Sequence, residues 1–106
     1  MTLRVQIERA AETDMAEIVT YLQEQQPATA LRFVRDIRKA FTFLAEHPEA
    51  GRKYETTHPL LQNLRIWRVK GFERYLIFYR VGQASLLIER VLYGGRDLEG
   101  ILAGEE

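Results

Sequence analysis

Arginine and aromatic side chains alternate between residues 65 and 96, and they are the groups best suited to chemistry. The set comprises Arg65, Trp67, Arg68, Arg74, Arg80 and Arg96. A guanidinium can hold a phosphate through two parallel hydrogen bonds, and an indole beside it can stack on a base. The alternative is that the rings fill the core while the arginine stems lie over apolar surface. Both interpretations stay open for Arg65, Trp67 and Arg96, which lie near strand ends and turns.

Groups that could transfer a proton are scarce around these cations. Cleavage of RNA at a 2′-hydroxyl needs a base, an acid and cations at the scissile phosphate. Glu55 and His58 fall in a polar loop that no nearby motif fixes, and Tyr93 follows a predicted strand. If the chain is a nuclease, its candidate catalytic residues are Arg52, Glu55, His58, Arg65, Tyr93 and Arg96. The pattern favours binding over catalysis.

No metal ion or cofactor is predicted. His47 and His58 lack the clustered ligands and the spacing that a zinc site needs. Gly94-Gly95 follows a strand but is not a nucleotide-binding fingerprint. Ser85, the only serine, falls at a hairpin, and the chain has no cysteine for a thiolate nucleophile.

Three consecutive strands are predicted to position the arginine–aromatic set. They cover residues 64–70, 74–81 and 85–94, and the gaps at Gly71 and 82–84 suit antiparallel hairpins. The middle strand is almost wholly aromatic or branched, as a central strand covered on both faces would be. Its rings, Tyr75, Phe78 and Tyr79, are therefore predicted core residues.

Upstream segments are predicted to pack against these strands. Residues 3–8 alternate as a half-buried strand, and two amphipathic helices, 10–24 and 28–46, meet at a corner that contains Pro27. A short helical segment, 96–102, capped by Asp97, ends the chain. The prediction is one α+β domain over residues 1–106. It has an N-terminal strand, an antiparallel helix hairpin on an antiparallel sheet, a three-strand meander (βααβββ) and a short C-terminal helical segment.

Composition and charge narrow the function classes. The sequence has no signal peptide core and no run of membrane-spanning length, so we expect a cytoplasmic protein without membrane contact. Its net charge is zero, but residues 52–80 hold seven basic side chains against two acidic ones. A basic face suits a polyanion or an acidic protein partner. The alternative is that the charged side chains cover a solvent-exposed sheet surface and prevent aggregation.

The order of elements and three local runs carry a family resemblance. The runs are FLAEHPEAGR at 43–52, RYLIFYRV at 74–81 and ERVLYGGRD at 89–97. On these the sequence resembles the ParE/RelE superfamily of small toxins from type II toxin–antitoxin (plasmid stabilisation) modules, most closely its ParE-like branch. The resemblance covers nearly the whole chain.

Two activities occur on this fold, so the resemblance implies alternatives. ParE-like toxins bind DNA gyrase and trap cleaved DNA, whereas RelE-like toxins are ribosome-dependent endoribonucleases that cut messenger RNA. Leu76 and Leu102 stand where the nuclease branch tends to carry an arginine and a proton-transferring side chain, although Arg96 matches a nuclease arginine. We therefore expect a gyrase inhibitor, with a RelE-like nuclease or a degenerate, non-toxic family member as the alternatives.

The resemblance also implies partners and the surfaces that meet them. A cognate ParD-like antitoxin would wrap a disordered segment over the helix hairpin and the sheet edge, giving a toxin–antitoxin hetero-oligomer. Val19, Tyr21 and Leu31 are the expected antitoxin contacts, although Val19 could equally complete the core. The arginine–tryptophan set named first is the expected target surface, with gyrase as the target and nucleic acid contacted indirectly.

Overall fold

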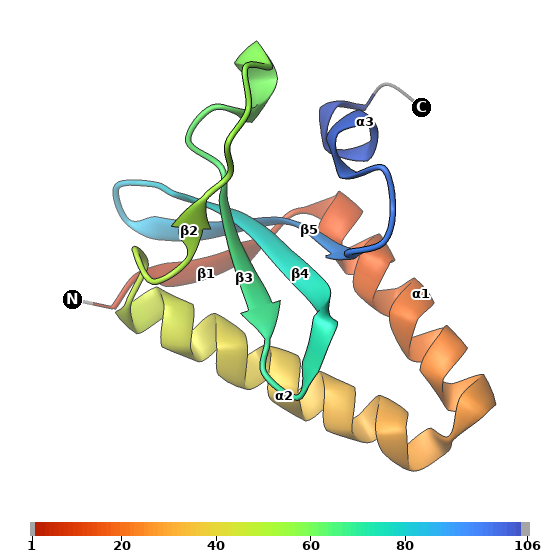
Figure 1. The fold of residues 1–106 in the computed structure, drawn as a ribbon. Helices are drawn as coiled ribbons and strands as arrows, with labels where there is room; N and C mark the ends of the chain where they lie inside the picture. The colour runs from red at the N-terminus through yellow and green to blue at the C-terminus, as the bar shows by residue number, and fades with distance from the viewer. Residues whose placement is uncertain (1, 105–106) are drawn as a thin grey trace.

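A sheet of five strands has two long helices packed on one face and a short helix with a 3₁₀ turn on the other (Figure 1). The computed structural model describes residues 2–104. The elements are β1 (Arg4–Ile7), α1 (Arg9–Gln25), α2 (Pro27–Glu46), β2 (Arg52–Lys53), the 3₁₀ turn η1 (Pro59–Leu61), β3 (Arg65–Val69), β4 (Phe72–Val81), β5 (Ser85–Tyr93) and α3 (Leu98–Ala103). The α+β class and the predicted order of elements are confirmed.

The strand order is β1-β5-β4-β3-β2, which puts the last strand of the chain beside the first. The meander β3-β4-β5 is antiparallel, as predicted. The N-terminal strand instead pairs with β5 in parallel, Arg4 opposite Ser85 and Ile7 opposite Ile88, so the sheet is mixed and not purely antiparallel.

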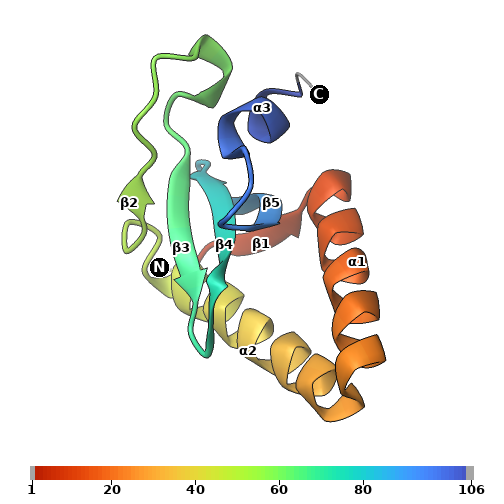
Figure 2. The same cartoon turned by 45° about the vertical axis from the view of Figure 1, so that its right-hand side comes forward.

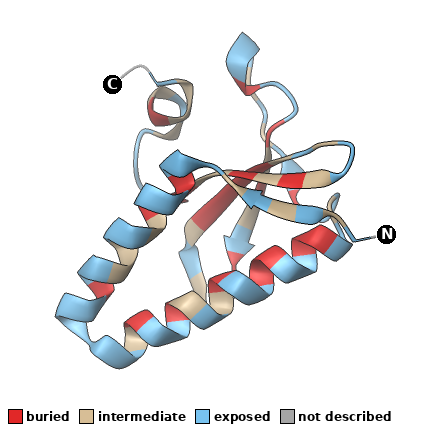
Figure 3. Ribbon diagram, turned by 180° about the vertical axis from the view of Figure 1, so that it is seen from behind, coloured by how far each residue is buried: buried red, intermediate tan, exposed pale blue. Residues whose placement is uncertain are grey.

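The two long helices meet at a sharp corner and then diverge (Figure 2). Pro27 occupies the first position of α2, where its missing N–H costs nothing, so Gln26 alone separates the helices. The buried positions of both helices face the sheet and the outer faces are exposed, which Figure 3 shows from behind. The amphipathic character predicted for the second helix is confirmed, since Ala30, Ile37 and Phe41 on one face of α2 lie in the main core.

β4 is covered on both faces, as its composition predicts. Ile77 and Tyr79 pack into the core beneath α1 and α2, whereas Leu76 and Phe78 belong to a second cluster on the opposite face. The second cluster is completed by Leu61 of η1 and by three residues of α3, Leu98, Ile101 and Leu102. The C-terminal segment is therefore part of a second core.

Several element boundaries differ from the sequence prediction. β4 begins two residues early, at Phe72, because Lys70 and Gly71 complete the turn in two residues and Gly71 adopts the positive φ, 93°, that this turn requires. α3 begins at Leu98 and not at residue 96, and Asp97, at its N-cap, makes no side-chain capping bond. The short strand β2 and the turn η1 were not predicted, since two or three residues carry no periodic pattern.

A buried tyrosine fastens the end of α2 to the sheet. The Tyr79 hydroxyl donates to the Pro48 carbonyl (2.7 Å) and accepts from the Gly51 N–H (2.9 Å). A side chain at Gly51 would come within 2.6 Å of that hydroxyl and 2.7 Å of the Ile66 carbonyl oxygen, which explains the glycine. Burial raises the pKa of Tyr79 above its ordinary value of 10.0.

The raised pKa of Tyr79 predicts how the free energy of unfolding changes at alkaline pH. A raised pKa in the folded state means that the stabilisation by neutral Tyr79 is complete below about pH 10 and is lost as pH rises through the folded-state value. Tyr79→Phe should lower the free energy of unfolding by about 1–3 kcal/mol at neutral pH, because the buried Gly51 N–H loses its acceptor. Urea unfolding should give a constant difference between variant and wild type up to about pH 9 and a narrowing one above about pH 10. A difference that does not narrow would mean that the hydroxyl is not held neutral by the fold.

Candidate functional site

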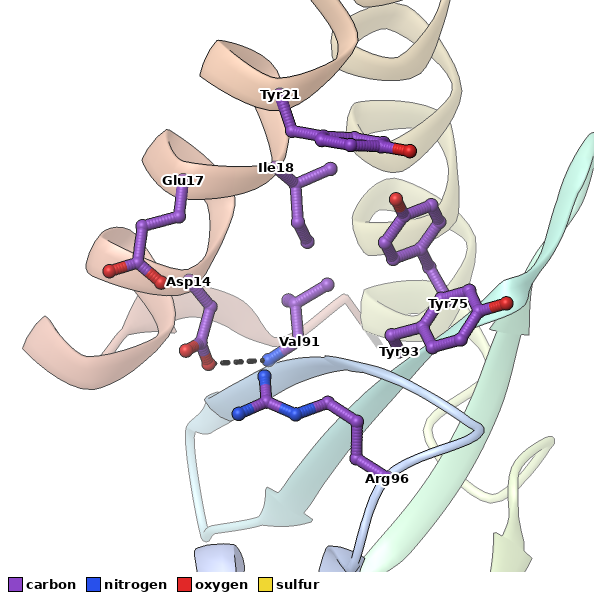
Figure 4. A pocket seen from close by; sticks show the side chains of 8 residues that line it. All are labelled: Asp14, Glu17, Ile18, Tyr21, Tyr75, Val91, Tyr93 and Arg96. Carbon is purple, nitrogen blue, oxygen red and sulfur yellow. Dashed lines mark hydrogen bonds between the residues drawn. The ribbon is translucent and has the colours of Figure 1, made fainter.

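A cleft of about 350 Å³ separates α1 from the ends of β4 and β5 (Figure 4). Its lining comes from α1 (Asp14, Glu17, Ile18, Tyr21), from β4 (Tyr75), from β5 (Val91, Tyr93) and from the loop that follows β5 (Arg96). Tyr21 and Ile18 reach from the helix toward Tyr75 and Val91 on the sheet. The cleft thus joins residues that lie far apart in the sequence.

The helix side of the cleft is fixed to the sheet by Asp14. β1 ends opposite Ile88, so the rest of the β5 edge has no strand partner there. Asp14 takes that place, since its carboxylate accepts from the Val91 N–H at 3.0 Å and from the Arg90 guanidinium at 2.7 and 2.8 Å. A bidentate charge-assisted pair of this kind is among the stronger polar contacts in proteins. It sets the width of the cleft at its base.

Tyrosines form the opposite wall. The rings of Tyr75 and Tyr93 meet edge to face, with centroids 5.7 Å apart. The Arg74 guanidinium donates to the Tyr93 hydroxyl at 2.8 Å, which holds that ring at the rim. Burial, with smaller contributions from Tyr21 and Tyr93, raises the pKa of Tyr75. The wall therefore offers flat, uncharged rings beside two cations, Arg74 and Arg96.

Arg96 is the cation at the mouth of the cleft. It is exposed, and its guanidinium points inward toward Asp14 and Val91 in Figure 4. Among the described residues it makes no ion pair within 4.0 Å. Its guanidinium is thus available to an anionic group of a partner.

Two of the predicted target-surface arginines are used inside the protein. Arg65 donates to the carbonyls of Gly51 (2.6 Å) and Glu49 (3.3 Å). Arg80 binds Glu89 and donates to the backbone carbonyls of η1 and the residue after it, Leu60 and Gln62. Both hold loops against the sheet, so their charges are largely satisfied.

The other members of that set separate into two groups. Arg74 and Arg96 lie at the cleft lined by Tyr21, Tyr75 and Tyr93, which we call the tyrosine cleft. Trp67 and Arg68 line a different hollow with Arg52, near β2. Arg68 also donates to the Glu73 carbonyl across the β3-β4 turn at 2.9 Å.

The candidate nuclease residues are not gathered into one site. Tyr93 and Arg96 share the cleft, whereas Arg52 lies by Trp67. Glu55 and His58 belong to the loop before β3 and do not line the cleft, and His58 Nδ1 accepts from the Leu60 N–H at the start of η1. No group of three or more His, Cys, Asp or Glu side chains that could hold a metal exists in residues 2–104.

The predicted antitoxin contacts occupy three different environments. Tyr21 is 55% exposed and lines the cleft, and Leu31 is 74% exposed on the outer face of α2. Val19 is half-buried against the main core. The sequence analysis did not identify Asp14 as a site residue. The available signal was its position on the apolar stripe, between Ala11 and Ile18.

Among residues 2–104, neither long helix carries the continuous apolar stretch that spanning a bilayer requires.

A family model described as "ParE toxin of type II toxin-antitoxin system, parDE" matches residues 5–98, from β1 to the start of α3. Ten chains of solved structures match the fold. One, described as "Chromosomal ParDE TA system from P. aeruginosa", has a TM-score of 0.72 and 21% identity, covering 87% of this chain and 96% of that chain. No curated protein matches the sequence.

Proposed function

This chain belongs to the ParE toxin family of type II toxin–antitoxin systems, and on that basis we propose that it inhibits DNA gyrase by binding it. A cognate ParD-like antitoxin neutralises it in a cytoplasmic hetero-oligomer. The observation that carries the proposal is the composition of the cleft, where three tyrosines stand beside Arg74 and Arg96 while Glu55 and His58 lie outside it. Exposed rings with cations bind a surface, but they do not supply a positioned acid–base pair.

Tyr21 supports a direct mode of neutralisation. It is the predicted antitoxin contact that also lines the cleft, on the side opposite Tyr93 and Arg96. An apolar antitoxin side chain placed between Tyr21 and Tyr75 would fill the space that gyrase needs. In this proposal the antitoxin and gyrase compete for one cleft.

Arg96→Ala tests the target surface. A charge-assisted hydrogen bond contributes about 1.5–3 kcal/mol, so the toxin concentration for half-maximal gyrase-dependent plasmid cleavage should rise about tenfold or more. Purified toxin, gyrase, plasmid and ATP suffice, with a parallel reaction lacking gyrase. The thermal unfolding midpoint should not change, because Arg96 is exposed.

Arg4→Ala is the matched control. Arg4 is also exposed, but it lies opposite Ser85, at the other end of β5 from Tyr93. It should behave as wild type in the gyrase assay. Equal potency of Arg96→Ala and Arg4→Ala would remove the cleft from the target surface, and a wild type without any effect on gyrase would reject the proposed target.

One observation favours a second candidate, the ribosome-dependent nuclease. The Arg74 guanidinium donates to the Tyr93 hydroxyl at 2.8 Å, which places a cation beside a hydroxyl in the cleft, two of the groups that a nuclease site needs. Messenger RNA cleavage in a translating extract that Tyr93→Phe abolishes, without any gyrase effect, would put this candidate first. If neither activity appears and expression without antitoxin leaves growth unharmed, the chain is a non-toxic member of the family.

A further inference from the structure

A column of stacked rings lies on a different part of the surface from the tyrosine cleft. Trp67 of β3 and Phe43 of α2 stack with centroids 5.3 Å apart and planes 25° apart. His47 continues the column, 4.7 Å from Phe43 with planes 35° apart. Phe43 remains 40% exposed despite both contacts. We call Trp67, Phe43 and His47 the aromatic ridge.

Two hollows that share Trp67 in their lining each hold two cations. One, of about 290 Å³, is lined by Trp67 with Arg52 and Arg68. The other, of about 630 Å³, is lined by Trp67 and Phe43 with Lys39 and Lys70. In a chain with no net charge, four cations around one indole are a local concentration of positive potential.

Acidic side chains offset only part of this charge. Asp36 lines only the larger hollow, where its carboxylate accepts from Arg35 at 3.3 Å, and the Glu73 carboxylate accepts from the Gly71 N–H at the edge of the same hollow. Among the described residues, Lys39, Arg52 and Lys70 make no ion pair within 4.0 Å. Both hollows next to the Trp67 indole therefore offer cations to an anionic ligand.

We propose that the aromatic ridge binds an unpaired DNA strand, with bases stacked on the outer faces of Trp67 and His47, the two ends of the column, and phosphates held in the two hollows. Stacking needs splayed bases, which a duplex does not offer. A phosphate chain supplies a negative charge at each successive nucleotide, which suits cations in two hollows that share one indole. No hydroxyl or amide side chain of the described residues lines either hollow, and the one carboxylate there, Asp36, is already paired with Arg35, so RNA gains no dedicated contact for its 2′-hydroxyl.

This inference goes beyond gyrase inhibition and does not require it. A strand held on the ridge would let the toxin contact nucleic acid directly while the tyrosine cleft engages protein. Because the binding test contains neither gyrase nor antitoxin, its failure is distinguishable from failure of the proposed function.

Fluorescence anisotropy of a labelled oligothymidylate of about 20 nucleotides tests the ridge at about 50 mM salt. Wild-type toxin should bind it, and His47→Leu should weaken binding about tenfold, the equivalent of one lost stacking contact. Lys39→Glu with Lys70→Glu should weaken binding further and flatten its salt dependence. Duplex DNA of the same length should bind more weakly than the single strand, and oligouridylate no more tightly.

Arg4→Glu with Arg9→Glu is the matched charge control. Both arginines are exposed, on β1 and the first turn of α1, and neither lines either hollow, so this pair should keep most of the affinity. Equal losses of affinity in the two double variants would show that only net charge matters and would overturn the proposal. Failure of the wild-type toxin to bind the oligonucleotide would also overturn it. If ridge variants bind DNA normally but no longer bind the antitoxin, the ridge is a protein contact and the proposal is wrong.

Discussion

Phe41→Ala is expected to lower the free energy of unfolding by about 3–5 kcal/mol. Phe41 is 6% exposed and belongs to the main core beneath the sheet. Removing a buried phenyl ring loses its transfer free energy and leaves a cavity that the fixed α2 and sheet cannot close. The free energy of unfolding of a native domain is only about 5–15 kcal/mol in total, so the variant should unfold at a much lower urea concentration than the wild type.

Phe43→Ala gives the matched comparison two residues further along the same helix. Its ring is 40% exposed and rests on Trp67, so the expected loss is about 1 kcal/mol, mainly from the stacking contact. Urea denaturation followed by far-UV circular dichroism measures both variants. Similar losses at the two positions would mean that α2 is rotated from the orientation described.

Asp14→Ala is expected to cost about 3 kcal/mol, the lower end of the range for breaking a buried ion pair. The lower end applies because the Arg90 side chain keeps 25% of its surface exposed and can recruit water. The substitution also leaves the Val91 N–H at the β5 edge without its acceptor. Asp14→Asn keeps an oxygen for that N–H and should cost less than half as much.

A double-mutant cycle separates the pair from its surroundings. Asp14→Ala and Arg90→Met, alone and combined, should show a coupling energy above about 1 kcal/mol, since the two side chains bind each other in bidentate fashion. Additive losses would contradict a direct interaction. Because Asp14 sets the base of the tyrosine cleft, Asp14→Asn should also weaken gyrase inhibition under conditions where it remains folded.

Local periodicity explains why much of the fold was predictable. The two-residue alternation of 3–8, the helical stripe that contains Phe41 and the glycine break at Gly71 are all properties of neighbouring residues. Each element needs an apolar face in its own sequence before it can pack anywhere. The same local runs carried the resemblance to ParE toxins that the family match bears out.

The roles of the arginines could not be read in this way. In the sequence nothing distinguishes the arginines at positions 65, 80 and 96. In the structure, Arg65 and Arg80 bind backbone carbonyls of folded loops, whereas Arg96 faces a cleft. Whether a guanidinium is satisfied depends on carbonyls that approach it only after folding. Composition alone therefore overstated how many cations are available to a partner.

The sequence by itself determined which segments are strands and helices, which side chains are apolar enough to form the core, and the family. Only the tertiary structure decided that β1 joins β5 in parallel, that Asp14 binds a strand 77 residues away, and that the cations divide between the tyrosine cleft and the aromatic ridge. The physical reason is range. Periodic patterns report on residues a few positions apart, whereas a site is made where distant surfaces meet, and that meeting is set by the packing of the whole chain.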